Sequence, residues 1–275
     1  MKAAPGAMNA PTVSVNVDPQ NPGQFFGCCG LLELATRAWG GARGWFSRGT
    51  FHLVPDAGCT ADATLASLVL AVRDAPISQL DERDDMSSPM LLGEPFNLTL
   101  DWWKDARSGG NRLKVWAGSM RPVRIAMAMQ AALTDAVREG AGLFDYGSVV
   151  FDPEDSSKKV EPYYFDSRRG LSAQSRDIGF APDALQMTTT AFPAVEFFCL
   201  VGLQRSRPVA VHSERSRIFE YHTWETPCRA PILPVAVCGL LTPCTGSRYR
   251  FENSFRTDQK KHKAFLPAEL IGGSK

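Results

Sequence analysis

The chain has 275 residues, 44% of them hydrophobic and 21% charged, so it can form one large domain or two small ones with real cores. This composition excludes disorder as the main state. The formal net charge is only +1, but the first 100 residues hold 6 basic and 10 acidic side chains, whereas residues 168–275 hold 15 and 9. The C-terminal part is therefore the basic part.

The first residues, MKAAPGAMNAP, contain one lysine and no apolar segment, so we expect no signal peptide and interpret residues 1–11 as a flexible leader. Residues 12–275 are predicted to form a single compact domain, with a boundary near residue 167 as the alternative. The seven cysteines contain no C-x-x-C pair, which favours a reducing, cytoplasmic location over a disulfide framework.

The stretch 13–39 is the centre of the predicted fold. Val13, Val15 and Val17 alternate with polar residues, which predicts a half-buried strand. A Pro/Gly-containing turn follows, and from Phe25 to Trp39 nearly every residue is apolar or small. We therefore expect a helix that is packed on several sides and is too short and too interrupted to span a bilayer.

The remaining elements are predicted from periodicity and from capping or breaking residues. Helices are expected after an N-cap at Thr60, from Pro122 to about Glu139, and from Pro193 onward. Strands are expected at 45–54, 96–102, 163–165, 209–212, 217–224, 232–237 and 248–255. No internal repeat is evident. The pattern predicts an α+β fold with a mixed or antiparallel sheet, about three buried helices and a candidate ferredoxin-like element at the N-terminus.

The common signatures of enzymes are absent from the sequence. There is no phosphate-binding loop, nucleophile elbow, H-E-x-x-H motif or dinucleotide fingerprint, and the four histidines are far apart. The acidic run 81–85 lacks the regular spacing of a metal loop and is interpreted as a solvated loop. His222 and three cysteines have gaps of five, nine and five residues, which favour a core cluster over zinc: Cys228, Cys238 and Cys244. We expect no catalytic residue, metal or cofactor.

Basic residues interleaved with aromatic residues are the positive signal, because a nucleic-acid groove needs cations for phosphates and flat side chains for bases. The first candidate cluster is Lys104, Arg107, Arg112, Lys114, Arg121 and Arg124, with Trp103 and Trp116 as candidate stacking residues. The second is Arg168, Arg169 and Arg176, and the third is Arg205 and Arg207 with Arg215 and Arg217. Lys260, Lys261 and Lys263 are interpreted as a solvated tail. Composition leaves another interpretation open, a solvated basic edge with its tryptophans in the core.

Three motifs carry a resemblance to a known family: NPGQFFGCCGLLELA at 21–35, LKVWAG at 113–118, and GFAPDAL with FPAVEFFCLVGLQRSRP between 179 and 208. In this order they resemble the small Csb-type CRISPR-associated protein of type I-G (formerly type I-U) systems. That family is regarded as a reduced form of the Cascade large subunit, the Cas-eight group. The Gly-Cys-Cys of the first helix and the C-terminal part depart from the resemblance.

The resemblance implies a non-catalytic subunit of a crRNA-guided antiviral surveillance complex. Such a subunit contacts target DNA near the protospacer-adjacent motif, the guide RNA, or both. The implied partners are crRNA, target DNA, the other Cascade subunits and a transiently recruited nuclease-helicase, with no membrane. Two alternatives stay open. One is a backbone or bridging subunit that contacts only guide RNA and neighbouring subunits. The other is a metal-dependent nuclease or RNA-processing enzyme that uses Asp81, Asp84, Asp85 or one of the scattered histidines.

Overall fold

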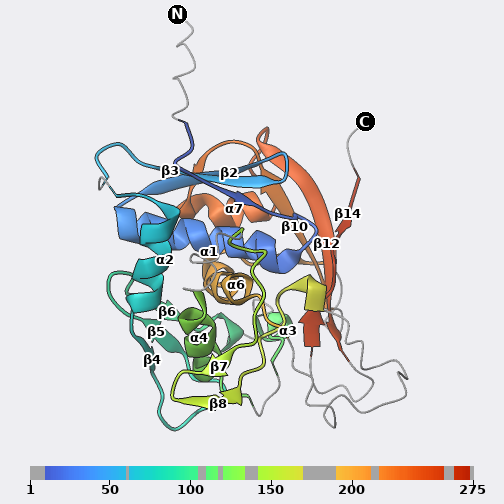
Figure 1. The fold of residues 1–275 in the computed structure, drawn as a ribbon. Coiled ribbons are helices and arrows are strands. Elements are labelled where there is room, and N and C mark those ends of the chain that lie inside the picture. The colour runs from blue at the N-terminus through green and yellow to red at the C-terminus, as the bar shows by residue number, and fades with distance from the viewer. Residues whose placement is uncertain are drawn as a thin grey trace, which may run out of the picture.

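The computed structural model describes residues 10–59, 62–104, 110–116, 120–133, 142–169, 190–211, 217–256 and 263–272 (Figure 1). Most of the predicted leader and the predicted N-cap Thr60 lie outside these ranges. The helices are α1 (Pro22–Trp39), α2 (Leu65–Asp74), α3 (Gly110–Leu113), α4 (Pro122–Ala131), α6 (Pro193–Arg205) and α7 (Leu233–Val237), with short 3-10 helices η1 (Trp102–Lys104), η2 (Ser167–Arg169) and η5 (Ala230–Ile232).

The first sheet contains β1 (Val13–Asn16), β2 (Ala42–Ser47), β3 (Thr50–Pro55) and β11 (Cys228–Arg229), in the order β1-β3-β2-β11. β3 pairs antiparallel with both β1 and β2, while α1 connects β1 to β2. This is a split β-α-β connection, the unit from which ferredoxin-like folds are built. The N-terminal part of the chain therefore has the connectivity of half such a fold.

The second large sheet lies beside the first helix (Figure 1). It contains β9 (Val209–Ala210), β10 (Ile218–Trp224), β12 (Thr245–Phe255) and β13 (Lys263–Phe265) in the order β13-β12-β10-β9, and β14 (Glu269–Leu270) also pairs with β12. Two smaller antiparallel sheets are formed by β4 (Ile77–Gln79), β5 (Met90–Leu92) and β6 (Leu98–Leu100), and by β7 (Phe151–Asp152) with β8 (Asp155–Lys159). The α+β prediction is confirmed.

The core is centred on α1, which lies between the first sheet and α6 (Figure 1). Asn21 caps α1 by accepting hydrogen bonds from the backbone N–H groups of Gly23 and Gln24, and Gly40 ends the helix in the left-handed conformation at φ 79°. α1 and α6 are buried along almost their whole length. Their side chains belong to one hydrophobic cluster that extends from Val13 to Ala268. No helix within the described ranges is long and apolar enough to cross a membrane.

Several sequence predictions of elements are confirmed, among them the strand at β1, the central helix α1, the helices that open at Pro122 and Pro193, and the strands β10 and β12. Others are wrong. The stretch 45–54 is a hairpin rather than one strand, because Arg48 and Gly49 adopt positive φ angles of 50° and 76° between β2 and β3. The N-cap of α2 is Thr64, which accepts a hydrogen bond from the N–H of Ser67.

Two segments have a different secondary structure from the predicted one. The stretch 232–237 forms η5 and α7 rather than a strand. Prolines 231 and 234 stand in the first turns of these helices, where the missing N–H costs no hydrogen bond. The segment 163–165 is buried but has no regular structure, and its Tyr164 has a positive φ of 72°.

Candidate nucleic-acid interface

The tryptophans predicted to stack on bases belong to a buried aromatic cluster. The ring centroid of Trp116 lies 5.8 Å from that of Trp102, 5.4 Å from that of Trp103 and 5.1 Å from that of Tyr163. Trp103 and Trp116 are only 1% and 2% exposed. A base reaches neither ring unless core side chains move. In this structure, both predicted stacking residues are core residues, as the open alternative interpretation describes.

Three of the predicted basic residues near this aromatic cluster form ion pairs. The pairs are Lys104 with Asp84 at 3.6 Å, Arg121 with Asp85 at 2.9 Å, and Arg124 with Asp152 at 2.9 Å and Glu154 at 3.0 Å. Arg107 lies outside the described residues. The acidic run 81–85 therefore supplies counter-ions. Within the described part of the chain, no three His, Cys, Asp or Glu side chains are arranged to hold a metal ion.

One arginine of the second predicted cluster and one of the third are held by acidic partners. Arg168 donates to the carboxylate of Asp166 at 2.6 Å, and its guanidinium lies 3.4 Å from the ring centroid of Phe192. Arg205 pairs with Glu33 at 2.6 Å. Arg169 and Arg207 are half-buried, and Arg176 lies outside the described residues.

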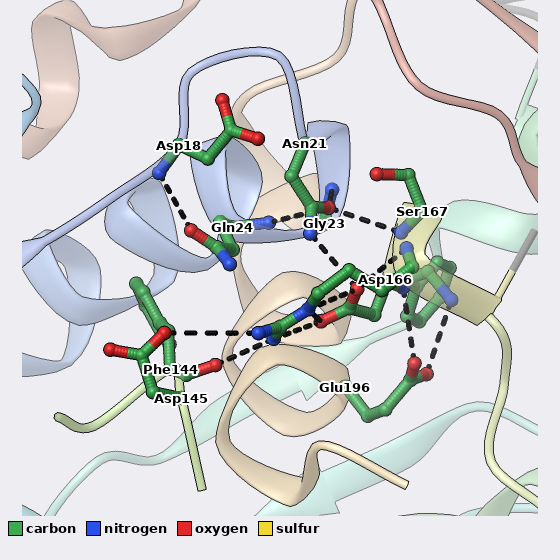
Figure 2. A network of polar contacts seen from close by, with 11 residues as sticks. Asp18, Asn21, Gly23, Gln24, Phe144, Asp145, Asp166, Ser167 and Glu196 are labelled. Atoms are coloured by element: carbon green, nitrogen blue, oxygen red, sulfur yellow. Dashed lines mark hydrogen bonds and ion pairs between the residues drawn. The ribbon is translucent and has the colours of Figure 1, made fainter. Parts of the chain in front are cut away.

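Arg168 belongs to a buried polar network that joins α1, α6 and the segment 163–169 (Figure 2). The side-chain amide of Asn21 donates to Asp166 at 2.9 Å, and Asn21 Oδ1 accepts from the N–H of Ser167 at 3.1 Å. Glu196, in the first turn of α6, accepts from the N–H groups of residues 165 and 166. The network fixes how three segments meet, so it explains the position of Arg168 structurally.

Glu196 is the most perturbed acid of this network. Its side chain is fully buried, and burial together with the nearby Asp166 carboxylate raises the pKa of its carboxyl to about 8. The backbone N–H donors act in the opposite direction but do not overcome the burial. Glu196 is therefore mostly protonated at neutral pH.

Three basic side chains lie close together where β12 pairs with β13. We call Lys114, Arg217 and Lys263 the basic cluster. Lys263 is the cross-strand partner of Phe255, and the guanidinium of Arg217 lies 4.6 Å from the centroid of that ring. The ammonium of Lys114 lies 5.2 Å from the ring centroid of Trp116. All three side chains are half-buried, and among the described residues none of them has an ion-pair partner.

Backbone contacts position the basic cluster. Asn253 of β12 is fully buried, and its amide donates to the carbonyl oxygens of Arg112 at 2.6 Å and Lys114 at 3.4 Å. The N–H of Lys263 donates to the carbonyl of residue 115 at 3.2 Å. The N–H of Asn253 donates to the carbonyl of Arg217 at 2.9 Å. One residue of β12 thus brings two distant parts of the chain together.

The electrostatics of the basic cluster are those of like charges held close together. Burial and, to a smaller extent, the positive charges of Arg217 and Lys114 together lower the pKa of Lys263 to about 8. Burial also lowers the pKa of Lys114, against the attraction of Asp84. Anionic groups bound here would relieve the repulsion, so the arrangement suits the phosphates of a nucleic-acid backbone.

Sequence reasoning found part of the basic cluster. It selected Lys114 and the adjacent Arg112, and it grouped Arg217 with other arginines. It was wrong about Lys263, which lies half-buried in β13 rather than in a solvated tail. The pairing of β13 with β12 joins residues that local patterns treat separately, so no short-range signal could have assembled the set.

No protein-family model, no curated protein and no solved structure matches this chain.

Proposed function

We propose that the chain is a non-catalytic subunit of a crRNA-guided, Cascade-type surveillance complex, and that it contacts target DNA near the protospacer-adjacent motif, the guide RNA, or both. The observation that carries the proposal is the basic cluster, in which Lys114, Arg217 and Lys263 lie close together and, within the described ranges, form no ion pair with an acidic side chain. The resemblance of three sequence motifs to the Csb-type family supplies the biological context.

The basic cluster supports contact with phosphates rather than with bases. Lys114 and Arg217 each lie over an aromatic ring, so the faces of Trp116 and Phe255 are covered by cations. Cations that rest on rings still direct N–H groups outward, and phosphate contacts fix the position of a strand without reading its sequence. We therefore assign to this surface the role of holding a nucleic-acid backbone while base pairing with the guide identifies the target.

The test compares two variants in the reconstituted complex. One carries Lys114→Ala, Arg217→Ala and Lys263→Ala, and the matched control carries Lys104→Ala, Arg121→Ala and Arg124→Ala, which removes three cations that have acidic partners. Because each lost contact to duplex phosphate reduces the slope of log K against log salt by about 0.9, the first variant should lose about 2 to 3 units of slope. The control variant should retain most of the wild-type slope. Equal slopes in wild type and the first variant, with both folded, would refute the assignment.

The same complex separates contact with DNA from contact with guide RNA alone. Photo-cross-linking from positions next to Lys114 and Lys263 should label target DNA, guide RNA or both. Labelling of RNA only would identify a backbone or bridging subunit, and would remove DNA contact from the proposal.

A further inference from the structure

A concave site lies toward the C-terminal ends of the two central helices. It has a volume of about 390 Å³ and is lined by Glu33 and Arg37 of α1, Gln204 and Arg205 of α6, and Leu98 of β6. We call it the arginine pocket. It is separate from the basic cluster in residues and in secondary structure, so it calls for its own explanation.

A buried carboxylate organises the two arginines of this pocket. The side chain of Glu33 is 4% exposed, whereas those of Arg37 and Arg205 are 29% and 36% exposed. Arg205 donates to the carboxylate of Glu33 from Nε at 2.6 Å and from Nη2 at 3.1 Å, so this parallel pair of N–H groups, the fork of the guanidinium, is occupied. Arg37 donates from Nε to Glu33 at 2.8 Å and from Nη1 to the carbonyl of Phe96 at 2.8 Å. Both guanidinium groups are therefore held in fixed orientations.

Each guanidinium has a terminal nitrogen that none of the described residues contacts by a hydrogen bond. Within the described residues, Nη1 of Arg205 and Nη2 of Arg37 have no hydrogen-bond partner. The amide of Gln204 is already engaged, since its oxygen accepts from the N–H groups of residues 101 and 102 and its nitrogen donates to Asp101 at 3.0 Å. The donors left for a ligand are thus one terminal nitrogen from each of two arginines.

The charge of the arginine pocket selects the kind of anion. Burial opposes ionisation of Glu33, but hydrogen bonds from Arg205 and Arg37 outweigh it and hold the pKa of its carboxyl below the usual value. Two cations and one anion leave a net charge of +1. A monoanion neutralises that charge, whereas a dianion would leave excess negative charge beside a buried carboxylate.

We propose that the arginine pocket binds one phosphodiester group of a nucleic-acid strand, with the adjacent sugar against Leu98. This rests on the proposed function, that the chain contacts nucleic acid. A carboxylate is bound best by two parallel N–H groups of one guanidinium, and Glu33 already occupies the fork of Arg205. Single donors from two guanidinium groups suit the two non-bridging oxygens of a phosphodiester, which is monoanionic at neutral pH.

The test is a titration of the full chain, followed through the Nε–H NMR signals of Arg37 and Arg205. The probe is uridylyl-uridine, which has one phosphodiester and no terminal phosphate; uridine and acetate are the controls. We expect saturable shifts with the dinucleotide, none with uridine, and weaker binding of acetate. Arg205→Gln should reduce the affinity about tenfold, the size of one charge-assisted hydrogen bond.

Arg205→Gln leaves the buried Glu33 with one partner and can therefore destabilise the fold. A second variant separates an effect on binding from an effect on folding. Glu33→Gln keeps the shape of the side chain and raises the net charge of the pocket to +2, so it should strengthen binding of the dinucleotide. Arg43→Gln is the matched control. Arg43 and Arg229 form ion pairs with one carboxylate, that of Asp56, at 2.7 Å and 2.9 Å, so the arrangement is comparable but lies outside the arginine pocket. It should leave the titration unchanged.

Three results would overturn the proposal: no saturable shift, saturation by acetate at the same or a lower concentration, or shifts confined to the basic cluster. The last result would leave the proposed function intact, since that function is tested by the salt dependence of the variant of Lys114, Arg217 and Lys263. If instead the dinucleotide saturates the arginine pocket while the variant of Lys114, Arg217 and Lys263 keeps the wild-type salt dependence, the arginine pocket is supported and the role of the basic cluster is refuted.

Discussion

At the scale of single residues, the proposed function predicts that Lys263 makes nucleic-acid binding depend on pH. Burial and two neighbouring cations lower its pKa to about 8, so the free protein loses this charge as the pH rises from 7 to 9. A bound polyanion favours the charged form and raises that pKa again. We expect a several-fold loss of affinity between pH 7 and pH 9, and proton uptake on binding near pH 8, measured by titration calorimetry in buffers of different ionisation enthalpy.

Lys263→Arg is the matched variant, because an arginine stays charged throughout this range. It should bind with little change between pH 7 and pH 9 and take up no proton. A wild-type affinity that is as insensitive to pH as that of the variant would show that Lys263 does not face the ligand.

Glu196 affects stability rather than binding. Its folded pKa of about 8 lies above the ordinary 4.5, so between these values the folded protein holds a proton that the unfolded chain has released. The contribution of this proton to the free energy of unfolding is complete below pH 4.5 and is lost as the pH rises toward 8. Glu196→Gln removes the ionisation, so wild type should lose stability relative to the variant over this range, by on the order of a few kcal/mol. Urea unfolding at pH 5, 7 and 9 measures the difference, and a constant difference would contradict the assignment.

At the scale of elements, local chemistry was enough to predict the central helices. The apolar run from Phe25 that ends before Gly40 marks α1, although the helix begins at Pro22, inside the predicted turn; Pro193 marks the start of α6. Local sequence patterns predicted the wrong secondary structure where apolar runs are short. The alternation around Val235 and Val237 is typical of a strand, but the flanking prolines fit the first turns of short helices. The basic cluster escaped prediction because strand pairing between β12 and β13 is a long-range property.

The two central helices also resemble each other in sequence, although no repeat is evident from local inspection. Gln24-Phe25-Phe26 with Gly30 has the same spacing as Glu196-Phe197-Phe198 with Gly202. Each helix is followed by an antiparallel hairpin, β2-β3 in one case and β9-β10 in the other. A Cβ on either glycine would clash with the carbonyl oxygen of the partner helix, at Phe198 and Phe26 respectively. The contact is reciprocal, so the helices cross at equivalent positions.

Gly202→Ala tests this crossing. The added methyl group meets backbone atoms of α1 that cannot move without separating the helices, so we expect a loss of about 3 kcal/mol or more in the free energy of unfolding. Gly27→Ala is the control in the same pair of helices, because its Cβ would meet the side chain of Phe144 at 3.1 Å rather than backbone. Denaturant unfolding of both variants gives the comparison. Equal small losses would mean that the helices can separate without cost.

At the scale of the whole molecule, charge is nearly balanced, with 30 basic and 29 acidic side chains. Many arginines and lysines are neutralised by partners such as Asp84, Asp152 and Glu220. A net charge of +1 gives little long-range attraction to a polyanion, so any binding depends on local groups. The isolated chain should therefore bind nucleic acid weakly, and its contacts should gain strength when neighbouring subunits hold the strand nearby.

This leads to a prediction for the complete assembly. On the proposed function, co-expression of the other Cascade subunits and a guide without this chain should give a complex that retains the guide but loses motif-dependent binding of target duplex. Adding wild-type chain should restore binding, whereas the triple alanine variant of Lys114, Arg217 and Lys263 should enter the complex and restore it only in part. Failure of assembly without the chain, together with full binding by the triple variant, would identify a scaffold and exclude the basic cluster as the contact surface.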